Sequence, residues 1–250
     1  MMFEATKLYA FWGNRREGFD ACARRIATML DNLAPLHPAF DGWQRQASDS
    51  ERWTPYGGRP RTHGELVEVL EEDWDDTELD RSRVPTAGLT TSAWNGENNP
   101  RSASFRCSIE NIETSRVPAN LVNLPLQSRR VGDPSLICVE TMTHALTVVA
   151  TAWDAVWGTV HPMDLWQVIK MPVGPLRMGW ITYLSAPLAG RFEAPSGCLT
   201  QPGPDGSLLI LATEEVFDPE NPEHLARAQA IQAALDRIQP ANLDVDEAPR

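Results

Sequence analysis

The residues that most readily bind metals or act in catalysis are scattered along this chain. None of its five histidines pairs with another three or four residues away, and its four cysteines are separated by 85, 31 and 60 residues. These spacings match neither metal sites nor redox motifs. The chain also lacks a glycine-rich phosphate loop and a Gly-x-Ser-x-Gly nucleophile motif. We therefore predict a protein without catalytic residues, metal sites or cofactors.

Carboxylates, by contrast, are concentrated in two parts of the chain. Residues 65–80 contain nine acids and no base, and residues 214–250 contain nine acids and three bases. The remainder is near neutral, because totals of 34 acids and 22 bases leave 16 acids and 19 bases there. A catalytic carboxylate pair needs a dry environment that separates the two pKa values, whereas the adjacent acids Glu71-Glu72-Asp73 and Asp75-Asp76 are expected to be solvated. A charged solvent-facing surface without a further role remains an open alternative.

The acidic run favours a role in binding. Like charges four residues apart destabilise a helix, so a chain that keeps such a run can be using its electric field. That field would speed encounter with a basic protein, and the net charge of −12 would repel nucleic acid and anionic membranes. The predicted partner-binding residues are the acids of the run, a tryptophan inside it and a tryptophan in the polar loop 47–61: Glu65, Glu68, Glu71, Glu72, Asp73, Trp74, Asp75, Asp76 and Trp53.

Hydrophobic periodicity indicates the element that carries the acidic run. Thr62 and Glu65 form a capping-box pattern at the start of a helix. Apolar residues then recur at helical spacing, which places the acids on the opposite, solvent-facing side. The apolar residues are Leu66, Val69, Leu70 and Trp74.

The same reading predicts an α+β fold with an antiparallel sheet and flanking helices in a single globular domain. Residues 1–240 are assigned to this domain and residues 241–250 to a flexible acidic tail. The predicted strands are 8–12, 89–94, 102–109, 120–124, 157–160, 179–184 and 208–212. The predicted helices are a short one at 38–43 and longer ones at 19–33, 62–75, 135–153 and 222–238, the last capped by Asn221.

The chain shows no targeting or membrane signal. Its first residues lack the basic region and apolar run of a signal peptide, and no stretch approaches 18 continuous apolar residues. The expected location is the cytoplasm, with cysteines in the reduced state.

Several short strings, taken in order over residues 11–238, resemble the immunity protein 52 family of bacterial polymorphic toxin systems. The apolar members of these strings sit at the ends of predicted elements, so we assign them to the fold and carry no partner-binding residue over from them. The strings are Phe11-Trp12-Gly13, Cys22-Ala23-Arg24-Arg25, Pro38-Ala39-Phe40 with Trp43, Trp94-Asn95-Gly96, Trp153-Asp154 with Trp157, Gly179-Trp180-Ile181-Thr182-Tyr183-Leu184, and Phe217-Asp218 with Asn221-Pro222-Glu223-His224.

The resemblance implies a cytoplasmic antitoxin that binds and neutralises a cognate nuclease toxin. Toxins paired with this family resemble restriction endonucleases in fold and are often delivered by type VI secretion, so the expected partner is a basic nuclease bound one-to-one. Two alternatives are an adaptor or chaperone that binds an effector without inhibiting it, and an enzyme of unrecognised type. Whether inhibition covers the active site, excludes DNA or prevents toxin assembly is left open by the sequence.

Overall fold

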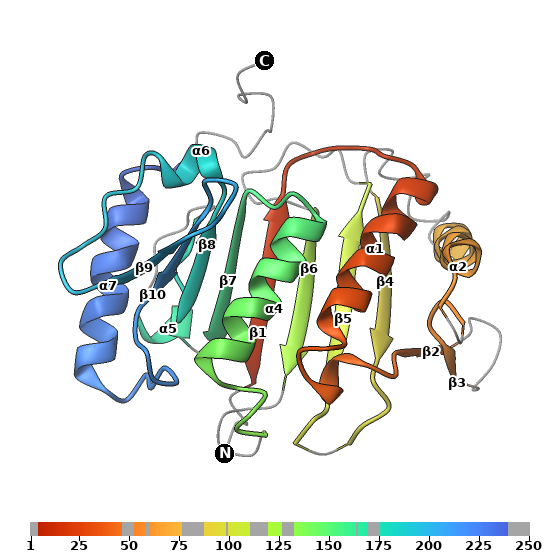
Figure 1. Cartoon of the computed structure of the whole chain (residues 1–250), viewed down its shortest axis with the longest axis horizontal. Helices are drawn as coiled ribbons and strands as arrows, with labels where there is room; N and C mark the ends of the chain where they lie inside the picture. Colours follow the sequence, from red (N-terminus) through yellow and green to blue (C-terminus); the bar gives the residue numbers. More distant parts are fainter. Residues whose placement is uncertain are drawn as a thin grey trace.

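The computed structural model describes residues 5–46, 53–58, 61–76, 88–98, 100–110, 120–126, 133–163, 165–169 and 176–239. Within them, ten strands form one sheet in the order β3-β2-β4-β5-β6-β1-β7-β8-β10-β9 (Figure 1). Every pair of neighbours is antiparallel, which confirms the predicted α+β fold. The strands are β1 (Thr6–Trp12), β2 (Gln44–Gln46), β3 (Trp53–Pro55), β4 (Leu89–Trp94), β5 (Ser104–Ile109), β6 (Asn120–Leu126), β7 (Trp157–Pro162), β8 (Ile181–Leu184), β9 (Leu199–Pro202) and β10 (Leu208–Leu211).

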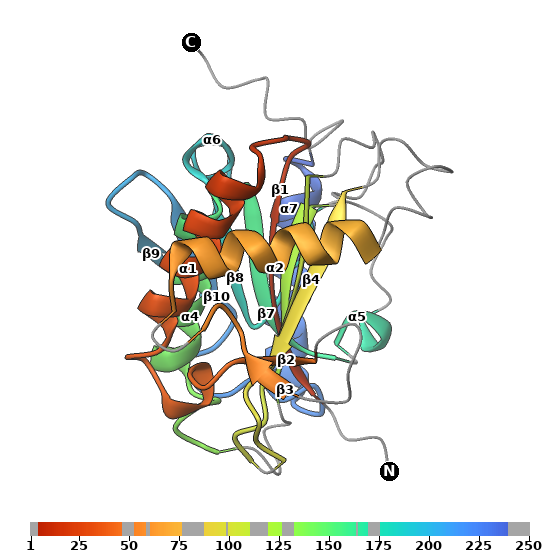
Figure 2. The same cartoon turned by 90° about the vertical axis from the view of Figure 1, so that its right-hand side faces the viewer.

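Two long helices, α1 (Phe19–Leu33) and α4 (Val139–Ala152), cover one face of the sheet, and Figure 2 shows both on the same side. The buried side of α1 has the predicted helical spacing. The prediction for α4 is wrong at its start, because residues 134–138 form turns and bends. There the Asp133 carboxylate accepts hydrogen bonds from the amide (3.0 Å) and hydroxyl (2.6 Å) of Ser135.

Strand β1 lies in the middle of the sheet, paired with β6 on one edge and β7 on the other. Successive side chains of a strand point to opposite faces. Trp12 stacks on Trp153, which follows α4, with ring centroids 4.5 Å apart. Phe11 points to the other face and stacks on Trp157 at 4.4 Å. The alternation along β1 therefore anchors an aromatic layer on each side of the sheet.

Two further helices lie at opposite ends of the molecule (Figure 1). Helix α2 (His63–Asp76) packs against α1 and β4. Helix α7 (Pro222–Asp236) is held at the other end through its Gln232 side chain, which bonds the backbone of Met178 (2.8 Å) and Leu176 (3.2 Å). Its start confirms the prediction, since the Asn221 side chain accepts from the Glu223 amide at 2.9 Å.

Several short elements differ from the sequence-based expectations. Segment 47–61 was predicted to be a loop, but Trp53–Pro55 forms β3 and pairs with β2. The short helix expected at 38–43 is a 3₁₀ turn, η1 (Pro38–Phe40). Strand β9 and the single-turn helices α5 (Leu165–Val168) and α6 (Ala186–Ala189) were missed. Three or four residues are too few to establish a periodicity.

No helix within the described ranges is long and apolar enough to cross a bilayer. The predicted tail 241–250 lies outside the described residues.

Candidate partner-binding surface

Helix α2 begins at the predicted cap. The Thr62 hydroxyl accepts a hydrogen bond from the Glu65 amide (3.3 Å) and donates one to the Glu65 carboxylate (2.6 Å). In a full capping box the carboxylate would instead accept from the Thr62 amide, which here donates to Gly57 O at 2.9 Å. The backbone before the helix therefore supplies part of the cap.

One side of α2 is anchored in the core, as predicted. Leu66, Val69 and Leu70 are buried. Trp74 is half-buried and meets the ring of Phe19 on α1 edge-to-face, with centroids 5.4 Å apart. The packing of Trp74 makes it an anchor of the helix first, which limits the area that its ring can offer to a partner.

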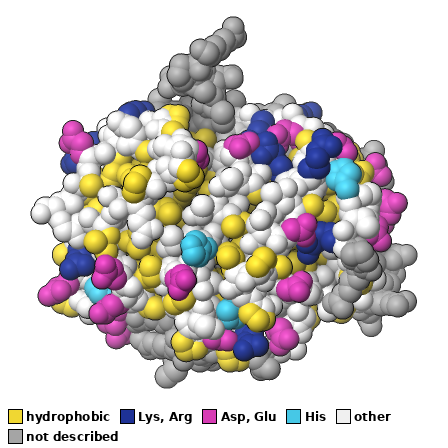
Figure 3. Space-filling model, viewed as in Figure 1, with side chains coloured by type: hydrophobic (Ala, Val, Ile, Leu, Met, Phe, Trp, Pro, Cys, Tyr) yellow, Lys and Arg dark blue, Asp and Glu magenta, His cyan; other side chains and the backbone are white. Residues whose placement is uncertain are grey.

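The opposite side of α2 presents the acids. Glu65, Glu68, Glu71 and Glu72 are exposed. Figure 3 shows acidic side chains at its right edge, where α2 lies in Figure 1. Among the described residues, Glu68 and Glu71 have no hydrogen-bond or ion-pair partner. Asp75 and Asp76 belong to α2, but their side chains lie outside the described part of the chain, as do Glu78 and Asp80.

A base that is distant in sequence neutralises part of the run. Arg45 of β2 is only 8% exposed and bonds Glu72 at 3.0 Å and Asp73 at 3.1 Å. A buried guanidinium requires such counter-charges. Asp73, whose side chain is 17% exposed, therefore holds the sheet to α2 rather than facing solvent. The expectation of an uncompensated run is corrected at these two positions.

Trp53 is 46% exposed, and it stacks edge-to-face on Trp94 with ring centroids 5.2 Å apart. It lies on the edge strand β3 opposite Gln46, so its side chain shares the face of Gln46 and not that of the preceding Arg45. Because the Arg45 side chain points to α2, the Trp53 side chain lies on the opposite face of the β2–β3 pair. The structure therefore places Trp53 on the strand next to β2 but not on the acidic face of α2.

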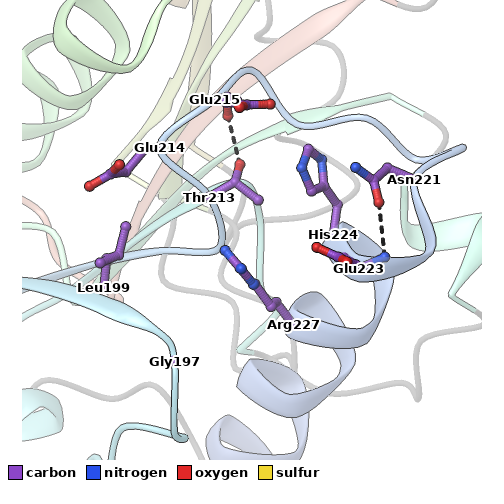
Figure 4. Close-up of a pocket in the computed structure, with 9 residues that line it drawn as sticks. All are labelled: Gly197, Leu199, Thr213, Glu214, Glu215, Asn221, Glu223, His224 and Arg227. Carbon is purple, nitrogen blue, oxygen red and sulfur yellow. Dashed lines mark hydrogen bonds between the residues drawn. The ribbon is translucent and has the colours of Figure 1, made fainter.

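Three acids of the second block, Glu214, Glu215 and Glu223, line a cleft at the other end of the sheet. The cleft has a volume of about 490 Å³ and lies between the residues before β9, the loop after β10 and the first turns of α7 (Figure 4). Figure 3 shows acidic side chains gathered at its lower left, over the start of α7. The lining residues are Gly197, Leu199, Thr213, Glu214, Glu215, Asn221, Glu223, His224 and Arg227.

Within the described ranges, no three metal-ligating side chains cluster. Burial and the nearby Glu110 carboxylate raise the pKa of the Cys22 thiol, and burial also raises the pKa of Cys107. Both thiols are therefore held in their unreactive neutral form. Burial lowers the pKa of His161 to about 4, so this ring is neutral at physiological pH.

Comparison with known proteins decides the family. The model of the family described as immunity protein 52 matches residues 6–241, which is nearly the whole chain. The chain belongs to this family. Membership implies that it binds a toxin partner and favours inhibition over catalysis.

A solved structure has a similar fold. It is described as the Pseudomonas aeruginosa T6SS protein PA0821, and the superposition has a TM-score of 0.54 with 13% sequence identity. It covers 94% of this chain and 73% of the other. At this level of identity the likeness concerns the fold alone. A comparison with curated proteins found no match to this chain.

Sequence reasoning missed Arg45 and the cleft residues His224 and Arg227. Arg45 is separated from its partners on α2 by 27 and 28 residues, so no local pattern links them. His224 was noted only as part of a helix-start string, and Arg227 only as one of three bases within an acidic block. The signal that was available is the position of both on the first two turns of one helix, three residues apart.

Proposed function

We propose that this protein neutralises a cognate nuclease toxin by binding it with the exposed acidic face of α2, so that the producing cell is protected. The observation that carries the proposal is the group of exposed carboxylates on a helix whose opposite side is fixed in the core. A nuclease needs a basic surface to hold the phosphates of its substrate, and a rigid row of carboxylates is complementary to such a surface.

The proposal that the toxin is a nuclease goes one step beyond the family assignment. Family membership implies a toxin partner, and the acidic face favours a basic one. A nuclease of restriction-endonuclease fold, bound one-to-one, has the expected charge. The description of the structural neighbour as a T6SS protein supports a link to type VI secretion. The proposed role requires no cofactor, metal or catalytic residue of this chain.

The area of a typical protein–protein interface limits how far a toxin bound at α2 can reach across this protein. A standard interface buries about 800 Å² on each partner, which corresponds to a disc with a radius of roughly 16 Å. Six strand spacings separate β4, which α2 contacts, from β10, which precedes the cleft. At about 4.8 Å each they span roughly 29 Å. An interface centred on α2 therefore does not extend to the acids beside α7.

The test is a pair of charge reversals with equal change in net charge. Glu68→Lys with Glu71→Lys removes two exposed carboxylates of α2, and Glu214→Lys with Glu215→Lys makes the same change beside α7. Association with the toxin encoded by the neighbouring gene is measured by stopped flow at 50 mM and 300 mM salt. We expect the α2 variant to associate about tenfold more slowly at low salt with a weaker salt dependence, because steering is local.

The α7 variant should stay within about twofold of the parent protein. Equal slowing by both variants would show that only net charge matters and would reject the α2 surface. A DNA-cleavage assay of the toxin at one equivalent of this protein separates the roles. Loss of cleavage supports an antitoxin, whereas binding with full cleavage identifies an adaptor.

A further inference from the structure

The cleft beside α7 holds two hydrogen-bond donors without acceptors in the described part of the chain. His224 is 8% exposed, and its Nδ1 accepts from the Asp218 amide at 3.0 Å. Since Nδ1 accepts, the proton of the neutral ring is on Nε2, and this N–H has no acceptor among the described residues. The ring of Phe217 packs beside the imidazole, with ring centroids 5.5 Å apart. The buried ring therefore presents an unused donor to the cleft.

Arg227 supplies the second donor from the next turn of α7. Its side chain is exposed and extends towards Thr213 (Figure 4). Glu223 lies four residues earlier on the same helix, a spacing that commonly allows an ion pair, yet the described residues give Arg227 no partner within 4 Å. Figure 4 shows the carboxylates of Glu214 and Glu215 directed away from it. The guanidinium thus shares the cleft with three glutamates and is paired with none of them among the described residues.

We propose that this cleft binds a carboxylate side chain of a polypeptide segment in which basic residues flank the acid. The guanidinium of Arg227 can hold a carboxylate through two parallel N–H bonds, and the Nε2–H of His224 can donate a third hydrogen bond. The positive end of the α7 dipole favours an anion at the same place. The flanking basic side chains would meet Glu214, Glu215 and Glu223 on the rim.

The rim determines the kind of ligand. A free small anion gains the two donors but is repelled by the three rim carboxylates, which have no partners among the described residues. A segment that carries its own positive charges beside the acid removes this repulsion. This inference does not rest on the toxin-binding role of α2, because the cleft lies outside a standard interface centred there.

The experiment uses the full chain and three probes. These are N-acetyl-Lys-Asp-Lys-amide, the otherwise identical peptide with Asn in place of Asp, and sodium acetate. The ring signals of His224 are followed by ¹H–¹⁵N NMR during titration. We expect saturable shifts with the Asp peptide in the millimolar range. The Asn peptide and acetate should bind at least tenfold more weakly, because each lacks one half of the charge pattern.

Three variants locate the binding site. Arg227→Gln should weaken binding of the Asp peptide at least tenfold, measured on the remaining shifts of backbone amides around the cleft. His224→Asn keeps an oxygen that can accept from the Asp218 amide but removes the Nε2–H, so a loss of a few-fold is expected. Arg191→Gln is the matched control, because Arg191 is exposed and outside the cleft, and it should bind as the parent does.

Equal binding of the Asp and Asn peptides, or equal losses in the Arg227 and Arg191 variants, would overturn the proposal. Acetate binding as tightly as the Asp peptide would overturn the polypeptide source, since a free carboxylate would then suffice. Toxin binding is measured separately in the Arg227→Gln variant and is expected to be unchanged. Failure of the toxin-binding role is therefore distinguishable from failure of the cleft proposal.

Discussion

At the α2 end of the sheet, acids stand on a helix face, and two of them are used to hold a buried arginine from β2. At the α7 end, acids surround a cleft in which an arginine and a histidine N–H remain without partners among the described residues. Both regions read alike in the sequence as blocks of nine acids. The difference teaches that pairing, rather than charge count, decides whether an acidic block stabilises the fold or remains available to a ligand.

Removing the arginine at each end gives the largest expected contrast. Arg45→Met should lower the free energy of unfolding by roughly 3 kcal/mol, because Asp73 is then left partly buried without its counter-charge. Arg227→Met, a change of the same type at an unpaired and exposed position, should stay within about 0.5 kcal/mol of the parent. Urea denaturation of both variants tests this. The comparison fails if the two losses are equal.

Acid should lower the free energy of unfolding through a buried histidine on β7, in the middle of the sheet. Burial lowers the folded-state pKa of His161 on β7 to about 4, below the usual value of about 6.5 in an unfolded chain. The unfolded state therefore binds more protons between pH 6.5 and 4, and stability falls as the pH is lowered through this range. At pH 5 the loss is about 2 kcal/mol relative to pH 8.

His161→Phe is the matched variant for this acid effect. Phenylalanine can keep the ring stacked between Tyr9 and Trp166 but cannot be protonated. Urea unfolding at pH 8 and pH 5 should show a smaller acid loss in this variant. An unchanged acid loss would place the sensitivity elsewhere in the molecule.

The helix caps at the two ends should contribute similar amounts. Asn221→Ala removes the acceptor for the Glu223 amide, and Thr62→Ala removes the acceptor for the Glu65 amide. Each should cost about 1 kcal/mol of stability. Only Asn221→Ala should also weaken binding of the Lys-Asp-Lys peptide, because it loosens the turn that carries His224. Loss of peptide binding in the Thr62 variant would indicate a general effect on the fold.

The smallest expected effect on stability comes from the exposed acids Glu214 and Glu215, compared with the paired acid Asp73. Glu214→Gln with Glu215→Gln should change the free energy of unfolding by less than about 0.5 kcal/mol, because both side chains are exposed. Asp73→Asn should cost more, since it halves the charge that faces Arg45. Thermal or urea unfolding compares the two. A greater loss in the double variant would show that the cleft acids already have partners.

The parts of the fold that were predictable repeat a pattern over many residues. Helix α1 and strands β4, β5 and β6 agree with their predicted positions within two residues, because period and turn signals coincide there. Strands β2, β3 and β9 are three or four residues long, and β9 is exposed at every position, so no alternation marks them.

The surface of α2 was easier to predict from the sequence than the Arg45 ion pairs or the cleft. The buried side of α2 follows from its own sequence and was predicted correctly, as was the exposure of Glu65, Glu68, Glu71 and Glu72. The ion pairs of Arg45 depend on how β2 lies against α2, which no spacing encodes. The cleft combines residues from 197 to 227 across two loops, and it exists only once β9, β10 and α7 have met.

The central position of β1 has a consequence for the time the protein needs to become active. Thr6 pairs with Leu126 on one side and with Pro162 on the other, so the middle of the sheet cannot close until residues far along the chain have left the ribosome. Synthesis proceeds at about 5–20 residues per second, and contacts so distant in sequence also form slowly. Newly made chains would therefore reach the folded form only after a delay, so the antitoxin role proposed above would require a standing pool of folded molecules.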